Sequence, residues 1–390
     1  MKVLVAHPAL QHSHQMAMAL YEHGMLQQYW SGVPVRGPEE PVPWWLPRAY
    51  RSKVRAVDIP RSMRRHPVVF TGLLKLGVRG LVGTNASDSA HRVFHLFDDW
   101  VARQIPRIRP DVVVAYENSA SRTFEAARRV GARCVLDAPA VHRVAAARLL
   151  EMPSQRYLPE IDARKDAEVA LADMIITCSR FAAQTYVDAG IDPTRLYPIL
   201  LGASPPAGLS RRRARTRTRF LFAGGVTVLK GVDLLLDAFA RVRARVPDAE
   251  LVIAGGAASP ALQLKIASTP GVVALGALPQ AALFQEIADA DCLVLPSRFD
   301  SFGMVVTEAL SCGTPVLVSD CVGAKEVVEE FPGSGWIVQV NVDALLDRML
   351  DLATVPALLD DARAHARLAG QTYTWARYRQ AAATTIGSLC

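Results

Sequence analysis

Two acidic residues, eight positions apart, are the first candidates for chemistry in this sequence. Asp300 and Glu308 lie in DSFGMVVTEALSCG, which follows an apolar run. An α-helix over this segment would place Asp300 at its mouth and Glu308 roughly two turns further on. Carboxylates at these two places could accept hydrogen bonds from sugar hydroxyls. In the alternative interpretation Asp300 only caps the helix and Glu308 lies on the surface, but the stretch around Glu308 is apolar and a carboxylate there needs partners.

The residues between the two carboxylates could supply backbone hydrogen-bond donors. The pattern predicts a helix that begins near Ser301–Gly303 and runs to about Ser311. The first turn of a helix has N–H groups without intrahelical partners. We therefore expect an anionic or hydroxylated ligand to be held by the N–H groups of Ser301, Phe302, Gly303 and Met304.

A glycine pair and a lysine form a second candidate, in FLFAGGVTVLKG at 220–231. A buried strand runs into Gly224 and Gly225, a loop follows, and Lys230 stands at the start of a helix. Glycines let backbone N–H groups approach an anion closely, and the helix N-terminus and the lysine both add positive charge. The segment suits a diphosphate, although its spacing is not that of a GxxxxGKS/T loop. An ordinary strand-to-helix turn with an exposed lysine is the alternative.

Short apolar runs alternate along the chain with longer amphipathic segments, and these elements must position the candidates. The runs are rich in Val, Ile and Leu and do not alternate with polar residues, which is typical of parallel strands covered on both faces. Helical segments such as 232–246 lie between them, so the sequence predicts a doubly wound α/β fold. The expected strands are 2–6, 112–116, 132–138, 174–179, 220–224, 251–255, 272–276, 292–297 and 315–320.

The alternation is interrupted at 201–219, where prolines, small residues and an arginine run predict a linker. We expect a first domain at 1–200 and a second at 201–372, each built like a mononucleotide-binding unit. Ligands of such sheets bind at the carboxyl ends of the strands, so two facing domains imply a central cleft. The arginine run could bind nucleic acid, but no aromatic residues interleave with it to stack bases, and we expect no nucleic-acid partner.

Composition narrows the class of protein. The 390 residues are 51% hydrophobic and 21% charged, which suits a globular chain of two domains. Apolar stretches are too short to span a membrane, and the N-terminal run is too short for a signal peptide. The six cysteines lack CxxC spacing, so we expect reduced thiols, a cytoplasmic location and no zinc site. The formal net charge of +7 implies an anionic partner.

The candidate segments are part of a longer series of motifs. Five of them follow one another in the order FAGGVTVLKGVDLLLDAF, ELVIAGG, ALGALPQAALFQEIADADCLVLPS, DSFGMVVTEALSCGTPVLVSD and GAKEVVEE. In order and spacing they resemble the retaining family-4 glycosyltransferases (glycosyl transferases group 1), whose GT-B fold has two Rossmann-like doubly wound domains facing a central cleft. The resemblance extends over roughly the last two-thirds of the chain, from LADMIITCSRFAAQTYVDAGI to YTWARYRQAAATTI. It implies that a C-terminal helix at 373–390 packs back on the first domain.

The resemblance implies a function and a role for each candidate. The function is retaining transfer of a sugar from a nucleoside-diphosphate sugar to a hydroxyl of a sugar or lipid-linked acceptor, in cell-surface polysaccharide, lipopolysaccharide or glycolipid assembly. Asp300 would contact donor sugar hydroxyls, Glu308 would hold the ribose, and Lys230 would bind the diphosphate. The backbone of 302–304 would face the sugar and phosphates, and Glu326 stands at a further acidic position of the family. The leaving phosphate can take the acceptor proton, so no metal or other cofactor is expected and no protein nucleophile is assigned.

Two residues depart from the family pattern. Gly225 stands where the family usually has an arginine, so one phosphate-binding cation is missing, and Arg298 is the candidate replacement. Asp300 stands in place of the more usual glutamate, and its side chain is shorter by one methylene.

The first domain contributes a histidine after the strand at 132–138. The resemblance places His142 near a family histidine that lines the sugar site, and we count it as a catalytic candidate. Asp137 and Arg143 are close enough in sequence to orient it. A histidine that only packs on or caps a helix is the alternative.

Loops after two other expected strands also carry polar residues. His12 and His14 lie in QHSHQ, after the first strand, where they could touch the donor phosphates or the acceptor. Their spacing resembles that of metal ligands, but no third ligand is evident and we reject a metal. Glu117 and Asn118 follow the strand at 112–116 and should face the same cleft.

The segment 43–66 combines tryptophans with basic residues, a composition that favours anionic membrane interfaces. We therefore hypothesise peripheral contact with the inner face of a membrane. In the alternative, the segment is an insertion whose tryptophans pack on their own domain. The residues concerned are Trp44, Trp45, Arg48, Arg51, Lys53, Arg55, Arg61, Arg64 and Arg65.

Two other classes of function stay open. One is another GT-B enzyme, such as a sugar-nucleotide epimerase or a glycan phosphorylase. The other is a non-catalytic protein that binds sugar nucleotides or nucleic acid, which the glycine at position 225 and the positive charge would favour.

Overall fold

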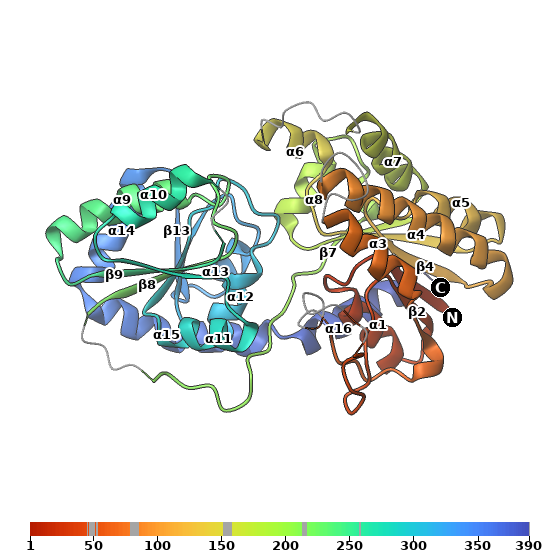
Figure 1. The fold of residues 1–390 in the computed structure, drawn as a ribbon, viewed down its shortest axis with the longest axis horizontal. Coiled ribbons are helices and arrows are strands. Elements are labelled where there is room, and N and C mark those ends of the chain that lie inside the picture. Colours follow the sequence, from red (N-terminus) through yellow and green to blue (C-terminus); the bar gives the residue numbers. More distant parts are fainter. Residues whose placement is uncertain are drawn as a thin grey trace. The chain divides into compact units, whose positions relative to one another are not determined.

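The chain forms two compact units, shown with their elements in Figure 1. The computed structural model describes residues 1–389 except 45, 47–50, 52–53, 79–85, 151–157, 213–216 and 257–258, and only the backbone of 74–78, 86–89, 149–150 and 158. Unit 1 consists of Met1–Thr177, Thr185–Ile199 and Tyr378–Cys390. Unit 2 consists of Cys178–Gln184 and Leu200–Arg377.

Unit 1 is built on a parallel sheet, in which the described residues form seven strands in the order β3-β2-β1-β4-β5-β6-β7. The central strands are fully buried because helices cover both faces. The strands are β1 (Val3–His7), β2 (Leu26–Ser31), β3 (Arg64–Arg65), β4 (Val112–Tyr116), β5 (Arg133–Ala138), β6 (Met174–Thr177) and β7 (Leu196–Pro198). The helices are α1 (Ser13–Glu22), η1 (Arg61–Met63), α3 (Val68–Val78), α4 (Ala86–Ile108), α5 (Ser121–Arg129), α6 (Arg143–Leu150), α7 (Leu158–Leu171), η2 (Pro193–Arg195) and α16 (Trp375–Gly387).

Unit 2 has a second parallel sheet, in which the described residues form six strands in the order β10-β9-β8-β11-β12-β13. The strands are β8 (Arg219–Ala223), β9 (Glu250–Ala254), β10 (Val272–Gly276), β11 (Cys292–Leu295), β12 (Val316–Ser319) and β13 (Gly335–Val338). The helices are α9 (Val232–Arg245), α10 (Pro260–Ser268), α11 (Gln280–Asp289), α12 (Met304–Ser311), α13 (Lys325–Glu330), α14 (Val342–Thr354) and α15 (Pro356–Thr372). Helix α8 (Arg180–Val187) begins in unit 2 and ends in unit 1.

Both sheets reverse their strand order at one place. In unit 1, successive strands are added on one side of β1 and then, from β4 onward, on its other side, so the order reverses between β1 and β4. In unit 2 it reverses in the same way between β8 and β11. In open α/β sheets, the crevice outside the carboxyl ends of the strands at such a switch point is where ligands bind. The loops after β1 and β4, and those after β8 and β11, are therefore the places at which each unit can form a site.

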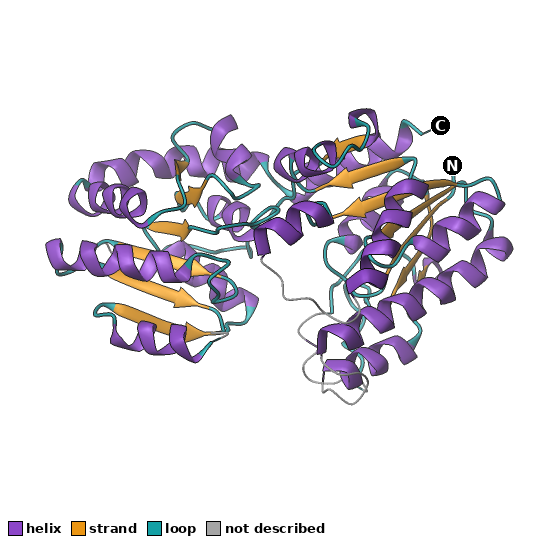
Figure 2. Ribbon diagram, turned by 90° about the horizontal axis from the view of Figure 1, so that it is seen from above, coloured by secondary structure: helices purple, strands orange, loops and turns teal. Residues whose placement is uncertain are grey.

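The predicted doubly wound α/β architecture is confirmed, with helices (purple) flanking the strands (orange) in each unit (Figure 2). All nine expected strands are present within one or two residues of their predicted ends. The sequence analysis missed β2, β3, β7 and β13, whose residues are less uniformly apolar or whose length is short. It also placed one helix start too early, since α12 begins at Met304.

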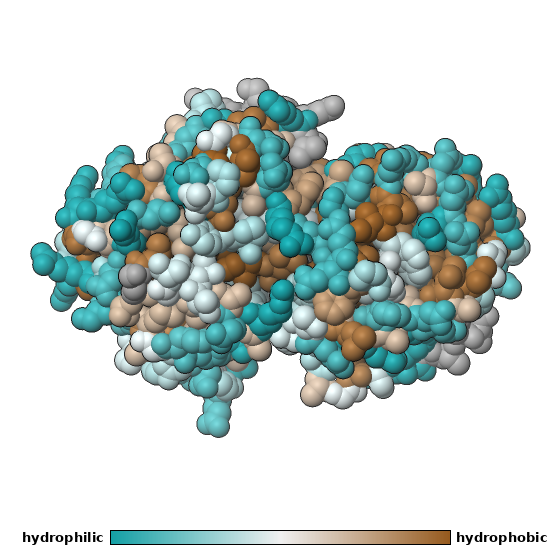
Figure 3. All heavy atoms as spheres, turned by 180° about the vertical axis from the view of Figure 1, so that it is seen from behind, coloured by the Kyte–Doolittle hydropathy of each residue, from teal (hydrophilic) through white to brown (hydrophobic). Residues whose placement is uncertain are grey.

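No helix in the described parts of the chain is both long and apolar enough to cross a membrane. On the face drawn in Figure 3, hydrophobic residues form small groups among hydrophilic ones. Trp44 is the most exposed of the large hydrophobic side chains that the structure describes, at 84%.

Candidate functional site

The loops that follow β8 and β11 are joined by hydrogen bonds at the switch point of unit 2. These two strands are neighbours, with Phe220 opposite Cys292. The Arg298 N–H donates to the Leu229 carbonyl over 2.9 Å. Parallel neighbouring strands bring their carboxyl ends to one edge, so the glycine–lysine segment and the acidic segment of the sequence meet there.

Lys230 and Asp300 form an ion pair across these loops. Lys230 Nζ donates to Asp300 Oδ2 over 2.5 Å, and the two side chains are 27% and 15% exposed. The Asp300 backbone is fixed as well, because its N–H donates to the Cys321 carbonyl and its carbonyl accepts from the Gly323 N–H, both over 3.0 Å. The sequence predicted both residues as ligand-binding groups, but it did not predict that they contact each other.

The sequence analysis named Arg298 as a candidate phosphate-binding cation, and in the structure its side chain is paired with Asp233. Its guanidinium forms two hydrogen bonds of 2.7 Å with the Asp233 carboxylate, and a third of 2.6 Å with the Val228 carbonyl. The pair holds the pKa of Asp233 below its usual range, against the effect of partial burial, and raises that of Arg298. Arg298 therefore ties the phosphate-loop candidate to the first turn of α9, which is a structural role.

The start of α9 is fixed by a close approach of two loops. Gly231 is the N-cap, with φ 70°, and a Cβ atom there would lie 1.9 Å from the Pro296 carbonyl oxygen. No other residue fits this position without a shift of the backbone. The helix start predicted at Lys230–Gly231 is thus confirmed.

Helix α12 presents fewer free donors than expected. Gly303, with φ 87°, is its N-cap, so Ser301 and Phe302 precede the helix. The Phe302 N–H lies 3.4 Å from Asp300 Oδ1, and the Ser301 carbonyl accepts from the Ser179 hydroxyl over 2.7 Å. The donors of the first helical turn therefore begin at Met304.

Glu308 lies about one turn further along α12 and is half-buried. Burial raises the pKa of its carboxyl above the usual value, and the described residues supply no hydrogen-bond partner or ion pair to its side chain. The sequence analysis argued that a carboxylate in this apolar stretch needs partners. Because the described residues supply none, the Glu308 carboxylate can accept hydrogen bonds from a bound ligand.

Glu326, to which the sequence analysis gave no definite role, caps helix α8. Its carboxylate accepts the N–H groups of Arg180 over 3.1 Å and Phe181 over 2.7 Å, and its side chain is 5% exposed. The Arg180 Nε is a further partner at 3.3 Å. A buried carboxylate at a helix N-terminus stabilises the helix. It accepts hydrogen bonds from free N–H groups, and its negative charge interacts favourably with the positive end of the helix dipole. No sequence signal nearby connects position 326 with 180.

His142 lies just after β5 in unit 1, where it was predicted. Burial and the nearby Arg143 lower its pKa, so the ring is neutral. Nδ1 accepts weakly from the Val144 N–H at 3.4 Å, the ring packs edge-on against Tyr186, and Nε2 has no partner among the described residues. The predicted orienting contacts are absent from this part of the structure, because Arg143 pairs with Asp166 at 2.6 Å and Asp137 contacts His12.

The loop after β4 donates hydrogen bonds to a carboxylate that the sequence analysis missed. Glu168 on α7 is fully buried and accepts the N–H groups of Asn118 over 2.7 Å and Ala120 over 2.8 Å. Burial raises the pKa of Glu168 to about 8, although these donors lower it. The start of α5 is therefore occupied by the protein's own side chain, while Glu117 pairs with Lys165 at 3.0 Å.

The basic segment 43–66 is partly engaged in unit 1. Arg64 pairs with Glu40 at 2.7 Å, and the Arg65 guanidinium lies 5.1 Å from the Trp100 ring centre. Arg51 donates to the carbonyls of Leu46 and Trp44. Trp45, Arg48 and Lys53 lie outside the described residues.

The arginine run of the linker is also engaged in ion pairs where it is described. Arg211 pairs with Asp291 at 2.8 Å and Arg217 with Glu250 at 3.0 Å. Arg219 contacts both Glu250 and Glu286. Residues 213–216 lie outside the described part of the chain.

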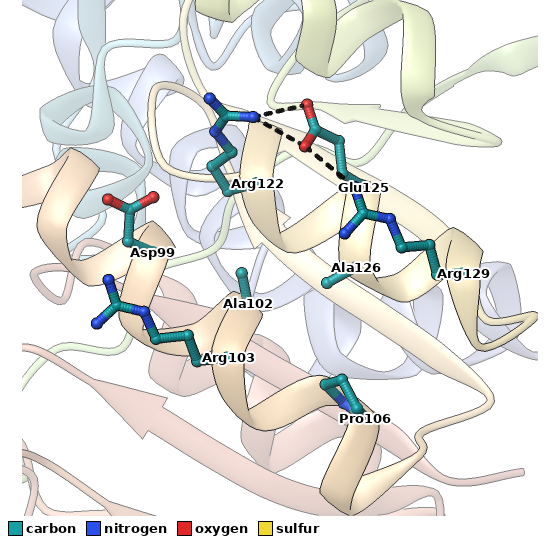
Figure 4. Close-up of a pocket in the computed structure, with 8 residues that line it drawn as sticks. All are labelled: Asp99, Ala102, Arg103, Pro106, Arg122, Glu125, Ala126 and Arg129. Atoms are coloured by element: carbon teal, nitrogen blue, oxygen red, sulfur yellow. Dashed lines mark hydrogen bonds and ion pairs between the residues drawn. The ribbon is translucent and has the colours of Figure 1, made fainter.

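An open groove of about 460 Å³ lies between α4 and α5 of unit 1 (Figure 4). Its apolar floor includes Ala102 and Ala126, and Arg122 and Glu125 pair at 3.0 Å on its rim. None of the predicted site residues lines this groove. Within the described residues, no group of three or more His, Cys, Asp or Glu side chains is arranged to hold a metal ion.

Comparisons with known proteins match the part of the chain that holds β8, β11 and α12. The family model described as Glycosyl transferases group 1 matches residues 217–354, which include β8, β11 and α12. A D-inositol 3-phosphate glycosyltransferase of Jonesia denitrificans is 30% identical over 52% of this chain and 54% of its own length. A GDP-mannose-dependent mannosyltransferase acting on phosphatidylinositol monomannoside, from Mycolicibacterium smegmatis, is 30% identical over 59% of this chain and 63% of its own length. The chain thus spans little more than half of these relatives.

Solved structures match the whole chain at low identity. Anabaena HepE in complex with UDP has a TM-score of 0.68 at 17% identity and is covered completely, as is this chain. Sucrose-phosphate synthase of Thermosynechococcus elongatus has a TM-score of 0.67 at 16% identity and covers all of this chain and 98% of its own. These likenesses establish the GT-B fold of the chain. The resemblance to glycosyl transferases group 1 is confirmed, and residues 217–354 are the part of this GT-B chain that matches that family.

Proposed function

We propose that this chain is a retaining glycosyltransferase that moves a sugar from a nucleoside-diphosphate sugar to a hydroxyl acceptor. The observation that carries the proposal is the Lys230–Asp300 pair, which joins the ends of β8 and β11 at the switch point of unit 2. A cation, a fixed carboxylate and a partner-free Glu308 supply the groups that a diphosphate, a sugar and a ribose require. Retention itself rests on the family resemblance.

The proposed chemistry needs charge stabilisation rather than a covalent step on the protein. Negative charge grows on the diphosphate as its bond to the sugar breaks, and in this proposal Lys230 and the N–H groups at the start of α12 stabilise it. Asp300 offsets the charge of Lys230, so the incoming diphosphate must share the ammonium group with Asp300. His142, neutral because burial lowers its pKa, could donate or accept a hydrogen bond to a sugar hydroxyl.

The comparisons suggest which donors and acceptors to try. HepE has been solved with UDP-glucose, and the Mycolicibacterium relative is named for GDP-mannose. Relatives named for inositol phosphate and for phosphatidylinositol mannoside favour a polyol or a lipid-linked acceptor. We propose a role in the assembly of cell-surface polysaccharide, lipopolysaccharide or glycolipid on these grounds.

Release of nucleoside diphosphate from UDP-glucose and GDP-mannose, without added acceptor, tests the proposal. We expect slow release by the wild-type protein and loss of most turnover in Lys230→Ala and Glu308→Ala. Arg348→Ala removes a cation of the same unit that pairs with Asp351 on α14, and it should keep the wild-type rate. Normal rates in both site variants would refute the site. Proton NMR of the freshly released sugar reads the configuration, and a 2-epimer of the intact donor would instead identify an epimerase.

Peripheral membrane contact through 43–66 is a further part of the proposal. It rests on Trp44, which is 84% exposed beside basic residues. Flotation with vesicles of anionic lipid at low salt should carry the protein upward, and Trp44→Ala should reduce the floating fraction. Absence of flotation at low salt would end this idea.

A further inference from the structure

The edge strand β10 of unit 2 is open to pairing with a further strand. In the described sheet it lies beside β9 on one side and has no neighbouring strand on the other. Neither of its faces is fully covered, since Val273 is 40% exposed and Ala274, whose side chain points to the opposite face, is exposed as well. An apolar strand with an open row of backbone groups is a template for pairing with another chain.

The other described edges are protected or better covered. In unit 1, β3 is an edge of two residues, both arginines, and β7 is an edge of three residues that ends at Pro198. Short length, charge and proline each oppose pairing with a further strand. In unit 2, β13 has four residues, of which only Ile337 is exposed. β10 has five residues without charge or proline, and its one irregularity is a register shift between Ala274 and Gly276, near its carboxyl end.

Backbone hydrogen bonds show which groups of β10 are open. The Leu251 N–H of β9 donates to the carbonyl of Gly271, just before β10, over 3.0 Å. In a parallel ladder every second residue faces the same neighbour, so the backbone groups of Val272 and Ala274 point away from β9. The Val272 N–H turns back to the Thr269 carbonyl, 3.4 Å away. The described residues supply no hydrogen-bond partner to either backbone group of Ala274.

The charge pattern around β10 selects a second copy of this chain as the partner. Residues 266–285, which include β10, carry no charged side chain, although 21% of the whole chain is charged. When a strand pairs antiparallel with its own copy, the residue at the two-fold axis meets itself, so a charge there meets a like charge. Pairing with a strand of another protein would place no such restriction on the sequence. An uncharged edge is therefore what self-pairing requires.

We propose that β10 pairs antiparallel with β10 of a second copy and joins two unit 2 sheets into one. The two-fold axis passes Ala274, which is the middle residue of the strand and has both outward backbone groups open. The Ala274 N–H of each copy donates to the Ala274 carbonyl of the other, and Val273 packs beside Leu275 of the other copy. The contact of one short strand is small, so the dimer is weak and depends on protein concentration.

Sedimentation velocity of the full chain over a range of concentrations tests the dimer. We expect the wild type to pass from monomer to dimer as the concentration rises. Ala274→Pro should weaken the dimer about tenfold or more, because it removes the N–H group that each copy donates. Proline is tolerated on an edge strand where that N–H faces open space, so the melting curve should stay close to that of the wild type. A wild type that remains a monomer at every concentration would overturn the proposal.

A mixture of two charged variants tests which residue lies at the axis. Ala274→Lys and Ala274→Glu each place two like charges opposite each other, and each should weaken the dimer about fivefold. Mixed in equal amounts, the two variants place lysine opposite glutamate, and the dimer should return. Weakening without this return would contradict pairing about Ala274.

Hydrogen exchange locates the contact in the chain. The amides of 270–279 should exchange more slowly at high than at low protein concentration, because the partner strand protects them, and this difference should vanish in Ala274→Pro. Ala364→Lys is the matched control, since it makes the same change at an exposed position of α15 in the same unit, and it should keep the wild-type dimer. Protection confined to another segment, or equal weakening by Ala364→Lys and Ala274→Lys, would overturn the assignment to β10. These measurements use no nucleotide sugar, so they decide the dimer independently of the proposed function.

Discussion

Gly225 offers a direct test of the diphosphate site, because an arginine can be added where the family usually has one. The residue is exposed, and a Cβ atom built on it has no neighbour within 4 Å. Its φ lies outside the left-handed range, unlike that of Gly224, whose φ is 143°. Gly225→Arg should therefore fold without strain, and the loss of a flexible glycine should change stability by no more than about 1 kcal/mol in its favour.

The expected gain in affinity follows from the charges around the phosphate loop. Lys230 is the one cation that the described phosphate loop carries, and Asp300 offsets it, so the pair brings no net charge. Arg298 is held by Asp233. An added guanidinium would make a hydrogen bond to a charged phosphate, worth about 1.5–3 kcal/mol. At about 1.4 kcal/mol for each tenfold change, Gly225→Arg should lower the Kd for UDP or GDP by roughly 10- to 100-fold.

Calorimetric titration with UDP and GDP measures this gain. Gly225→Ala is the matched control, since it adds the Cβ atom and removes the glycine without adding a charge. The difference between the arginine and alanine variants should shrink as salt is added, because it is electrostatic. Equal affinities of Gly225→Arg and Gly225→Ala at low salt would refute the placement of the diphosphate at this loop.

Three other substitutions probe carboxylates that the structure describes. Glu308→Gln should weaken nucleotide binding by about tenfold or more without lowering the unfolding temperature, because Glu308 has no described protein partner to lose and burial already raises its pKa; a calorimetric Kd and a melting curve show both. Burial raises the pKa of Glu168 to about 8, so the folded state binds a proton that the unfolded chain releases near pH 4.5, and this contribution to stability is present at acidic pH and is lost as the pH rises through about 8. The free energy of unfolding, measured with urea, should fall between about pH 5.5 and about pH 8.5 in the wild type and fall less in Glu168→Gln. An equal fall in both proteins would contradict this role of Glu168. Glu326→Gln should lower the free energy of unfolding by about 1–2 kcal/mol through weaker capping of α8, and an unchanged urea midpoint would exclude this role.

The sequence predicted the elements of the site better than the contacts between its side chains. Apolar strand runs and glycines located β8, β11 and the start of α9 because burial and left-handed backbone leave local signals. Lys230 and Asp300 were chosen separately, and their pairing depends on a contact between residues 70 positions apart.

Charged side chains whose partners are distant in sequence were placed less well. Arg298 was expected to bind phosphate, but Asp233 on the first turn of α9 takes its guanidinium. Asp137 was expected to orient His142, which lies five positions away, but it orients His12, which lies 125 positions away. A carboxylate has two oxygens and several sequence neighbours, so only the folded geometry decides which donor it meets.

The return of the chain to unit 1 at Tyr378 has a consequence for biosynthesis. His12 and Tyr378 pack edge-on, yet 366 residues separate them in the order of synthesis (378 − 12). At about 5–20 residues per second, roughly 20–70 s pass between their appearance on a ribosome. The sheet of unit 1 can form during this interval, but the ring that covers His12 is added only after all of unit 2 has been made. The environment of the His12–Asp137 pair is therefore completed late, and a truncated translation product would carry this pair without its tyrosine cover.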